Sequence, residues 1–81
     1  MSLLFSNSVC VLPVLLELSR DRISNVRFLA CKALGVAGVT LGVNHKLSQD
    51  FIIPRLVALT HDDKDNDVIN FAKEALELLK P

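Results

Sequence analysis

Hydrophobic residues along this chain recur at intervals of three and four positions, a spacing that favours amphipathic helices over strands. We predict an all-α chain of four helices with no strand, at about residues 8–19, 23–37, 48–60 and from 66 towards the C-terminus. In the second helix the expected buried face comprises Val26, Leu29, Ala30, Ala33, Leu34 and Ala37. In the fourth it comprises Val68, Phe71, Ala72, Ala75, Leu76 and Leu79. The alanines on these two faces allow a close approach of helices.

Polar and helix-breaking residues mark the expected helix ends. The expected N-caps are Ser24 or Asn25 for the second helix, Ser48 for the third, and Asp65, Asn66 or Asp67 for the fourth. Gly35 and Gly38 weaken the end of the second helix, and Gly42 favours a loop. We therefore predict a linker at residues 39–47, apolar enough to pack partly over the helices.

The helical pattern occurs twice. The segment VLPVLLELSRD at residues 11–21 returns as IIPRLVALTHD at 52–62, and VRFLACKAL at 26–34 returns as VINFAKEAL at 68–76. The first offset is 41 and the second 42, so one residue is inserted in the turn between the segments. A period near 40 with helical patterning predicts stacked helical hairpins. We expect one unit over residues 1–81, with repeat one at 8–38, the linker at 39–47 and repeat two at 48–81.

Composition narrows the range of partners and compartments. Nine basic residues balance nine acidic ones, so no net charge attracts nucleic acid or an anionic membrane. Cys10 and Cys31 are the only cysteines, too few for a zinc site. Both fall among apolar helical residues, where a free thiol behaves as a small hydrophobe. We expect buried thiols in a reducing compartment, the cytoplasm. Phe51 and Phe71 are expected in the core, with Phe28 beside it.

No catalytic constellation stands out, and we expect no catalytic residue, metal or cofactor. His45 and His61 are the only histidines, and His61 lies in a polar turn. The acidic run at residues 63–67 has the alternation of a calcium loop, but it lacks that motif's glycine and distal glutamate. The glycines at 35–42 are not followed by the Lys-Ser/Thr of a phosphate loop.

The repeated pattern Pro-x-Leu/Val-x-x-Leu, then Asp, then Val-Arg-x-x-Ala-x-x-Ala-Leu resembles the HEAT repeat. The matching residues of the first unit are Pro13, Leu15, Leu16, Leu18, Asp21, Val26, Arg27, Ala30, Ala33 and Leu34. Those of the second are Pro54, Leu56, Val57, Leu59, Asp62, Val68, Ala72, Ala75 and Leu76. The family pairs its frequent Arg with a turn Asp of a neighbouring repeat. By resemblance, Arg27 would pair with Asp21, Asp62 or Asp63, whereas Ile69 replaces the Arg in unit two.

Two stretches, NVRFLACKAL at residues 25–34 and DNDVINFAKEAL at 65–76, resemble the last two repeats of the scaffold subunits of protein phosphatase 2A. The resemblance implies a non-catalytic segment of a longer array that holds the phosphatase catalytic subunit through its intra-repeat turns. It implies a cytoplasmic location, with the nucleus as a further site. The implied partner-binding residues are Arg20, Asp21, Arg22, Asn25, Arg27, His61, Asp62, Asp63 and Lys64.

Two other roles remain open. A generic HEAT adaptor for transport or assembly would bind a partner helix through the second helix of each pair, where Lys32, Lys73, Glu74 and Glu77 lie. An N-terminal face formed by Leu3, Leu4, Phe5 and Val11 predicts self-association of the isolated chain. An enzyme of this architecture would carry His-Glu pairs, and none occurs.

Overall fold

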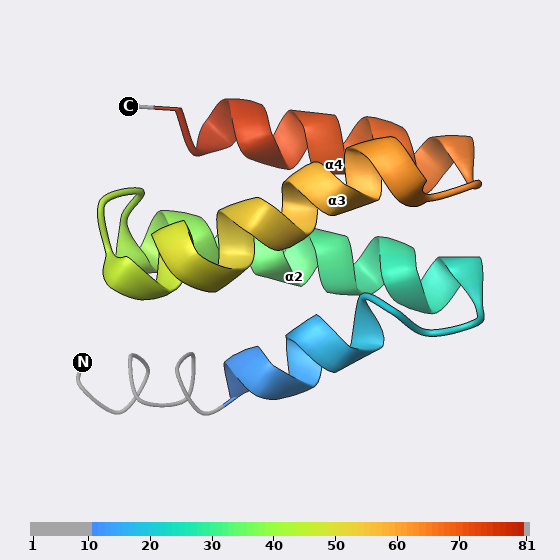
Figure 1. The fold of residues 1–81 in the computed structure, drawn as a ribbon, viewed down its shortest axis with the longest axis horizontal. Helices are drawn as coiled ribbons and strands as arrows, with labels where there is room; N and C mark the ends of the chain where they lie inside the picture. The colour runs from blue at the N-terminus through green and yellow to red at the C-terminus, as the bar shows by residue number, and fades with distance from the viewer. Residues whose placement is uncertain (1–10, 81) are drawn as a thin grey trace.

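The described helices run back and forth, each antiparallel to the one before it (Figure 1). The computed structural model describes residues 11–80. The first helix covers residues 11–18 of this range. It is followed by α2 (Ser24–Leu41), the π-helical segment η1 (Ser48–Ile52), α3 (Ile53–Asp62) and α4 (Asn66–Leu78). The all-α prediction is confirmed, with η1 running directly into α3.

The core lies where α4 packs against both α2 and α3. Its buried members are Leu12, Cys31, Leu34, Ala37, Ile52, Leu56, Leu59, Val68, Ala72, Ala75 and Leu79. Each large aliphatic side chain among them contributes roughly 1.5–3 kcal/mol by leaving water. The predicted stripe of α4 is confirmed, since Phe71 and Leu76 pack against this cluster. Leu41, Val43 and Leu47 also pack against it, as expected of an apolar linker.

Aromatic and sulfur side chains only partly follow expectation. Phe28 meets Phe71 edge to face, with ring centroids 4.9 Å apart and planes at 72°. Phe51, expected in the core, is exposed on η1, and Leu29 is likewise exposed. Cys31 is a buried free thiol, and burial raises its pKa to about 11. Cys10 lies outside the described residues.

The second helix is longer than predicted. It continues through Gly35 and Gly38 to Leu41, and it ends only at Gly42, which has φ of 98° and donates its N–H to the Gly38 carbonyl at 2.8 Å. Gly35 sits inside the helix because α4 comes very close: a Cβ there would lie 3.1 Å from the Cβ of Ala75. The glycines therefore permit close packing of α2 on α4, and the predicted helix end at Ala37 is wrong.

Helix starts also differ from expectation. Ile23, and neither Ser24 nor Asn25, precedes α2 in extended conformation, with no side-chain cap. The backbone N–H of Leu47 donates to Nδ1 of His45 at 3.0 Å, so His45 takes the capping role predicted for Ser48. Ser48 is instead buried inside η1. For α4, the prediction is confirmed at Asp65, whose Oδ1 accepts the N–H groups of residues 67 and 68.

The π-helical segment immediately precedes α3, whose second residue is Pro54. Proline has no N–H to return to the carbonyl four residues earlier. Here the N–H of Ile53 donates to the Ser48 carbonyl five residues back, which is the bond of a π-turn. The helix is thus locally widened just before Pro54.

Candidate functional site

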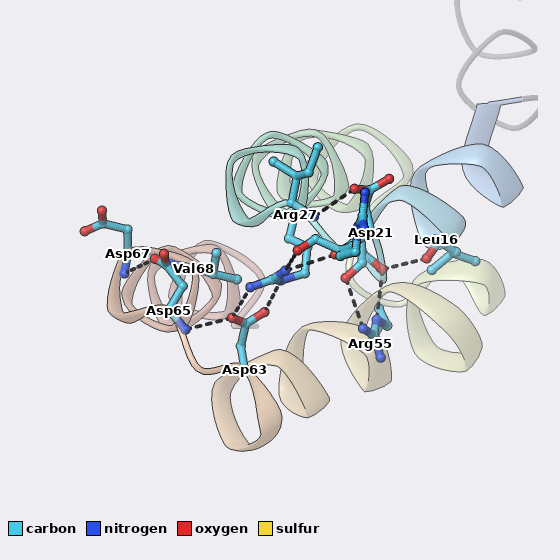
Figure 2. Close-up of polar contacts among 11 residues, drawn as sticks. Leu16, Asp21, Arg27, Arg55, Asp63, Asp65, Asp67 and Val68 are labelled. Carbon is cyan, nitrogen blue, oxygen red and sulfur yellow. Dashed lines mark hydrogen bonds and ion pairs between the residues drawn. The ribbon is translucent and has the colours of Figure 1, made fainter.

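Arg27 joins the two intra-repeat turns, of which one lies between the first helix and α2 and the other between α3 and α4. It lies in the first turn of α2, and its Nε and Nη2 donate to Oδ2 and Oδ1 of Asp63 at 2.7 and 3.0 Å (Figure 2). Asp63 directly follows α3. Only 17% of the Arg27 side chain and 3% of that of Asp63 are exposed. Of the three carboxylates that the resemblance offered to Arg27, the structure selects Asp63. The pair is therefore largely shielded from water.

The same guanidinium also fastens its own turn. Nη1 of Arg27 donates to the carbonyls of Asp21 and Arg22 at 2.9 and 3.1 Å. The hydrogen bond with Asp63 raises the pKa of Arg27. Burial opposes ionisation of Asp63, but hydrogen bonds from Arg27 and from the Asp65 N–H outweigh it and lower the pKa of Asp63. Both groups are therefore charged, and their bond holds the two turns together as one polar edge, called the turn edge below.

Equivalent hydrogen bonds in the two turns show which residues of the two predicted repeats correspond, and they do so more precisely than the sequence. The hydroxyls of Ser19 and Thr60 each donate to the carbonyl three residues earlier, at 2.6 Å. The carboxylates of Asp21 and Asp63 each accept the N–H two residues later, at 2.9 Å. The counterpart of Asp21 is therefore Asp63 and not Asp62. The inserted residue lies between Thr60 and Asp63.

Arg55 is a site residue that the sequence patterns did not single out. Its Nε donates to the Ser19 hydroxyl at 2.8 Å, and its Nη2 donates to the Ser19 carbonyl at 3.1 Å (Figure 2). Burial and the nearby positive charge of Arg20 lower the pKa of Arg55, while Asp62 and Asp63 act in the opposite direction. Comparison of the two units could have identified Arg55, because it stands where the first unit has the apolar Val14.

Six of the nine predicted partner-binding residues come together around one hollow of about 320 Å³, which Arg55 also lines. The six are Arg20, Asp21, Arg27, Asp62, Asp63 and Lys64. Asn25 lines a separate hollow beside Phe28 and Asp65, while Arg22 and His61 are exposed. Within the described part of the chain, no three His, Cys, Asp or Glu side chains are grouped to hold a metal ion.

The structure thus contains two helical hairpins whose turns are joined by an Arg–Asp pair. Residues 11–38 match the family model for the HEAT repeat. This part of the chain is a HEAT repeat. Such repeats generally mediate protein–protein contacts and are typically non-catalytic. The assignment of residues 48–81 as a second repeat stays a prediction.

Comparison with curated proteins and with solved structures gives no significant match. Among the helices that the structure describes, none has both the length and the apolar character needed to cross a bilayer.

Proposed function

We propose that this chain is a scaffold segment that helps to hold the catalytic subunit of a phosphatase of the 2A type through its intra-repeat turns. The observation that carries the proposal is the Arg27–Asp63 pair, which joins both turns into one polar edge. The phosphatase is suggested by the resemblance of residues 25–34 and 65–76 to the last repeats of the phosphatase 2A scaffold. The buried free thiol of Cys31 suits a reducing location in the cytoplasm, with the nucleus as a further site.

The chain would act by positioning. A rigid edge binds one surface of the catalytic subunit, while the rest of a longer array binds a targeting subunit. Holding the two near each other raises their effective concentration without any new chemistry. Rigidity matters here because a turn that is already ordered loses little conformational entropy on binding.

The test is binding of purified phosphatase 2A catalytic subunit to the 81-residue chain, measured by calorimetry. The double variant Arg20→Glu/Arg22→Glu reverses two exposed charges on the turn edge. We expect it to weaken binding by roughly tenfold or more, as loss of charge-assisted contacts does. Lys32→Glu/Lys73→Glu makes the same change in charge on the outer surfaces of α2 and α4 and should leave binding unchanged. Intact binding by the turn variant would overturn the site assignment.

A second candidate function is a generic adaptor that binds a partner helix on the face formed by α2 and α4. A specific observation favours it: a hollow of about 430 Å³ between these helices. Its apolar lining includes Val36, Val39, Phe71 and Leu78, with Lys32 and Glu74 beside them. An adaptor of this kind would not bind the phosphatase catalytic subunit, so absence of binding in the same calorimetric experiment would favour the second function over the first.

A further inference from the structure

Arg20 and Arg55 lie close together on the turn edge, and neither forms an ion pair with a carboxylate of residues 11–80. Among residues 11–80 the ion pairs join Arg27 to Asp63, Lys46 to Asp50 and Lys80 to Glu77, and none includes Arg20 or Arg55. Yet Arg20 and Arg55 are close enough for the charge of one to disfavour the charge of the other. Two neighbouring cations are unfavourable unless other groups supply negative charge. Asp62 and Asp63 supply some of it to Arg55, although neither carboxylate forms an ion pair with Arg20 or Arg55.

The end of the first helix supplies part of that charge. Nη1 of Arg20 approaches the Leu16 carbonyl at 3.5 Å, and Arg55 donates to the hydroxyl and carbonyl of Ser19. The carbonyls of Leu16 and Ser19 lie at the C-terminal end of the first helix, which is the negative end of its dipole. A guanidinium has five N–H donors. The described bonds of Arg55 use its Nε and one bond from Nη2, so further donors remain for a ligand.

Two hollows in the surface adjoin the side chains of Arg20 and Arg55. Arg20, Arg55 and Ala58 line the hollow of about 320 Å³ at the turns and also a second one of about 240 Å³. Apolar groups line the second hollow as well, among them Leu16, Pro54 and Phe51. Phe51 is 47% exposed and offers a free aromatic surface. A cationic pair therefore lies directly beside an apolar wall.

We infer that Arg20 and Arg55 together bind a carboxylate of a partner protein, with an apolar side chain of the same segment resting on Phe51 and Pro54. Arginine suits this ligand because its planar fork matches the two oxygens of a carboxylate. The surroundings favour a single negative charge over the double charge of a phosphate group. Asp62 and Asp63 line the first hollow and Asp50 lines the second, and they repel a dianion more strongly.

The inference deepens the proposed function and rests on it for the identity of the partner. It names the contact that a partner segment makes on the turn edge. The carboxylate has two sources in proteins, an acidic side chain or the C-terminal residue of a chain. Both present the same two oxygens, and amidated peptides separate them.

The experiment follows the Nε–H signals of the four arginines in the 15N-labelled 81-residue chain during peptide titration. The probes are acetyl-Leu-Glu-Leu-amide, acetyl-Leu-Gln-Leu with a free C-terminus, acetyl-Leu-Gln-Leu-amide and inorganic phosphate. We expect at least one carboxylate peptide to shift the signals of Arg20 and Arg55 while those of Arg22 and Arg27 move little. The neutral peptide should shift none. No shift with either carboxylate peptide, or tighter binding of phosphate than of both, would overturn the inference.

Variants make the assignment specific. Arg20→Gln should weaken binding of the carboxylate peptide by roughly tenfold, whereas Arg22→Gln, an equal loss of charge in the same turn, should not. Arg55→Gln should act like Arg20→Gln, provided that its circular dichroism is unchanged; Arg20→Gln decides alone if Arg55→Gln unfolds. Equal weakening by Arg20→Gln and Arg22→Gln would indicate general charge attraction and would refute the site.

The outcome is separable from that of the phosphatase proposal. A chain that binds the catalytic subunit through its turns but gives no peptide shift refutes the carboxylate site alone. A chain that binds the peptides but not the catalytic subunit refutes the phosphatase partner alone.

Discussion

The guanidinium of Arg27 grips both carboxylate oxygens of Asp63 across 36 positions of sequence. Because the same side chain also binds the carbonyls of Asp21 and Arg22, one residue orders both turns. The bond therefore orders the edge that is proposed to contact the partner, and it also stabilises the fold. Changes at Arg27 should therefore alter both.

Arg27→Ala should lower the free energy of unfolding by about 2–3 kcal/mol, because it leaves an almost fully buried carboxylate without its cation. Urea denaturation checks this value. Lys46→Ala is the matched control, since it removes an exposed ion pair with Asp50 that solvent screens, and it should change stability little. Equal losses for the two variants would show that the Arg27–Asp63 bond is no stronger than a surface pair.

The same pair predicts how stability depends on pH. The folded state lowers the pKa of Asp63 below its unfolded value of about 4. A lowered carboxyl pKa contributes stability above the unfolded pKa, and that stability is lost as pH falls through the folded pKa. We expect the stability advantage of the natural chain over Asp63→Asn to be constant near neutral pH and to shrink below about pH 4. Urea midpoints measured across this range check it, and an advantage independent of pH would contradict it.

The helices could be predicted from sequence because the residues that become buried recur at the spacing of a helix. Leu34, Val68, Ala72 and Ala75 lie on the expected faces, and Asp65 caps α4 as its position suggested. These features depend on residues near one another in sequence, where spacing and capping chemistry act directly.

The errors arise where tertiary packing decides. Gly35 weakens an isolated helix, but against Ala75 it allows close packing, so the helix continues. Likewise, the partner of Arg55 lies 36 positions away, beyond the reach of any local pattern. The choice of Asp63 over Asp62 depends on where one inserted residue falls, and only the hydrogen bonds of the turns locate it.

Gly35→Val should destabilise the chain by about 1–3 kcal/mol through overpacking, because the contact at Ala75 involves a short side chain that cannot rotate away. Thermal unfolding measures the effect. Ala75→Gly should partly rescue Gly35→Val, although either change alone lowers stability. Gly38→Val is an informative comparison, because a Cβ there would meet the far end of the Leu79 side chain, which can move. If Ala75→Gly gives no rescue, the close approach of α2 and α4 is not the reason for Gly35.

The first helix suggests that the isolated chain self-associates. It forms the outer layer at one end of the stack (Figure 1), and Val11 and Val14 on it are 45% and 56% exposed. Leu3, Leu4 and Phe5, which belong to the same predicted face, lie outside the described residues. Uncovered apolar end faces of helical arrays favour association. We expect a dimer by light scattering that dissociates on dilution. Val14→Arg, which copies the residue found at the matching position 55, should give a monomer with unchanged circular dichroism. A natural chain that stays monomeric at every concentration would contradict the proposed end-face contact.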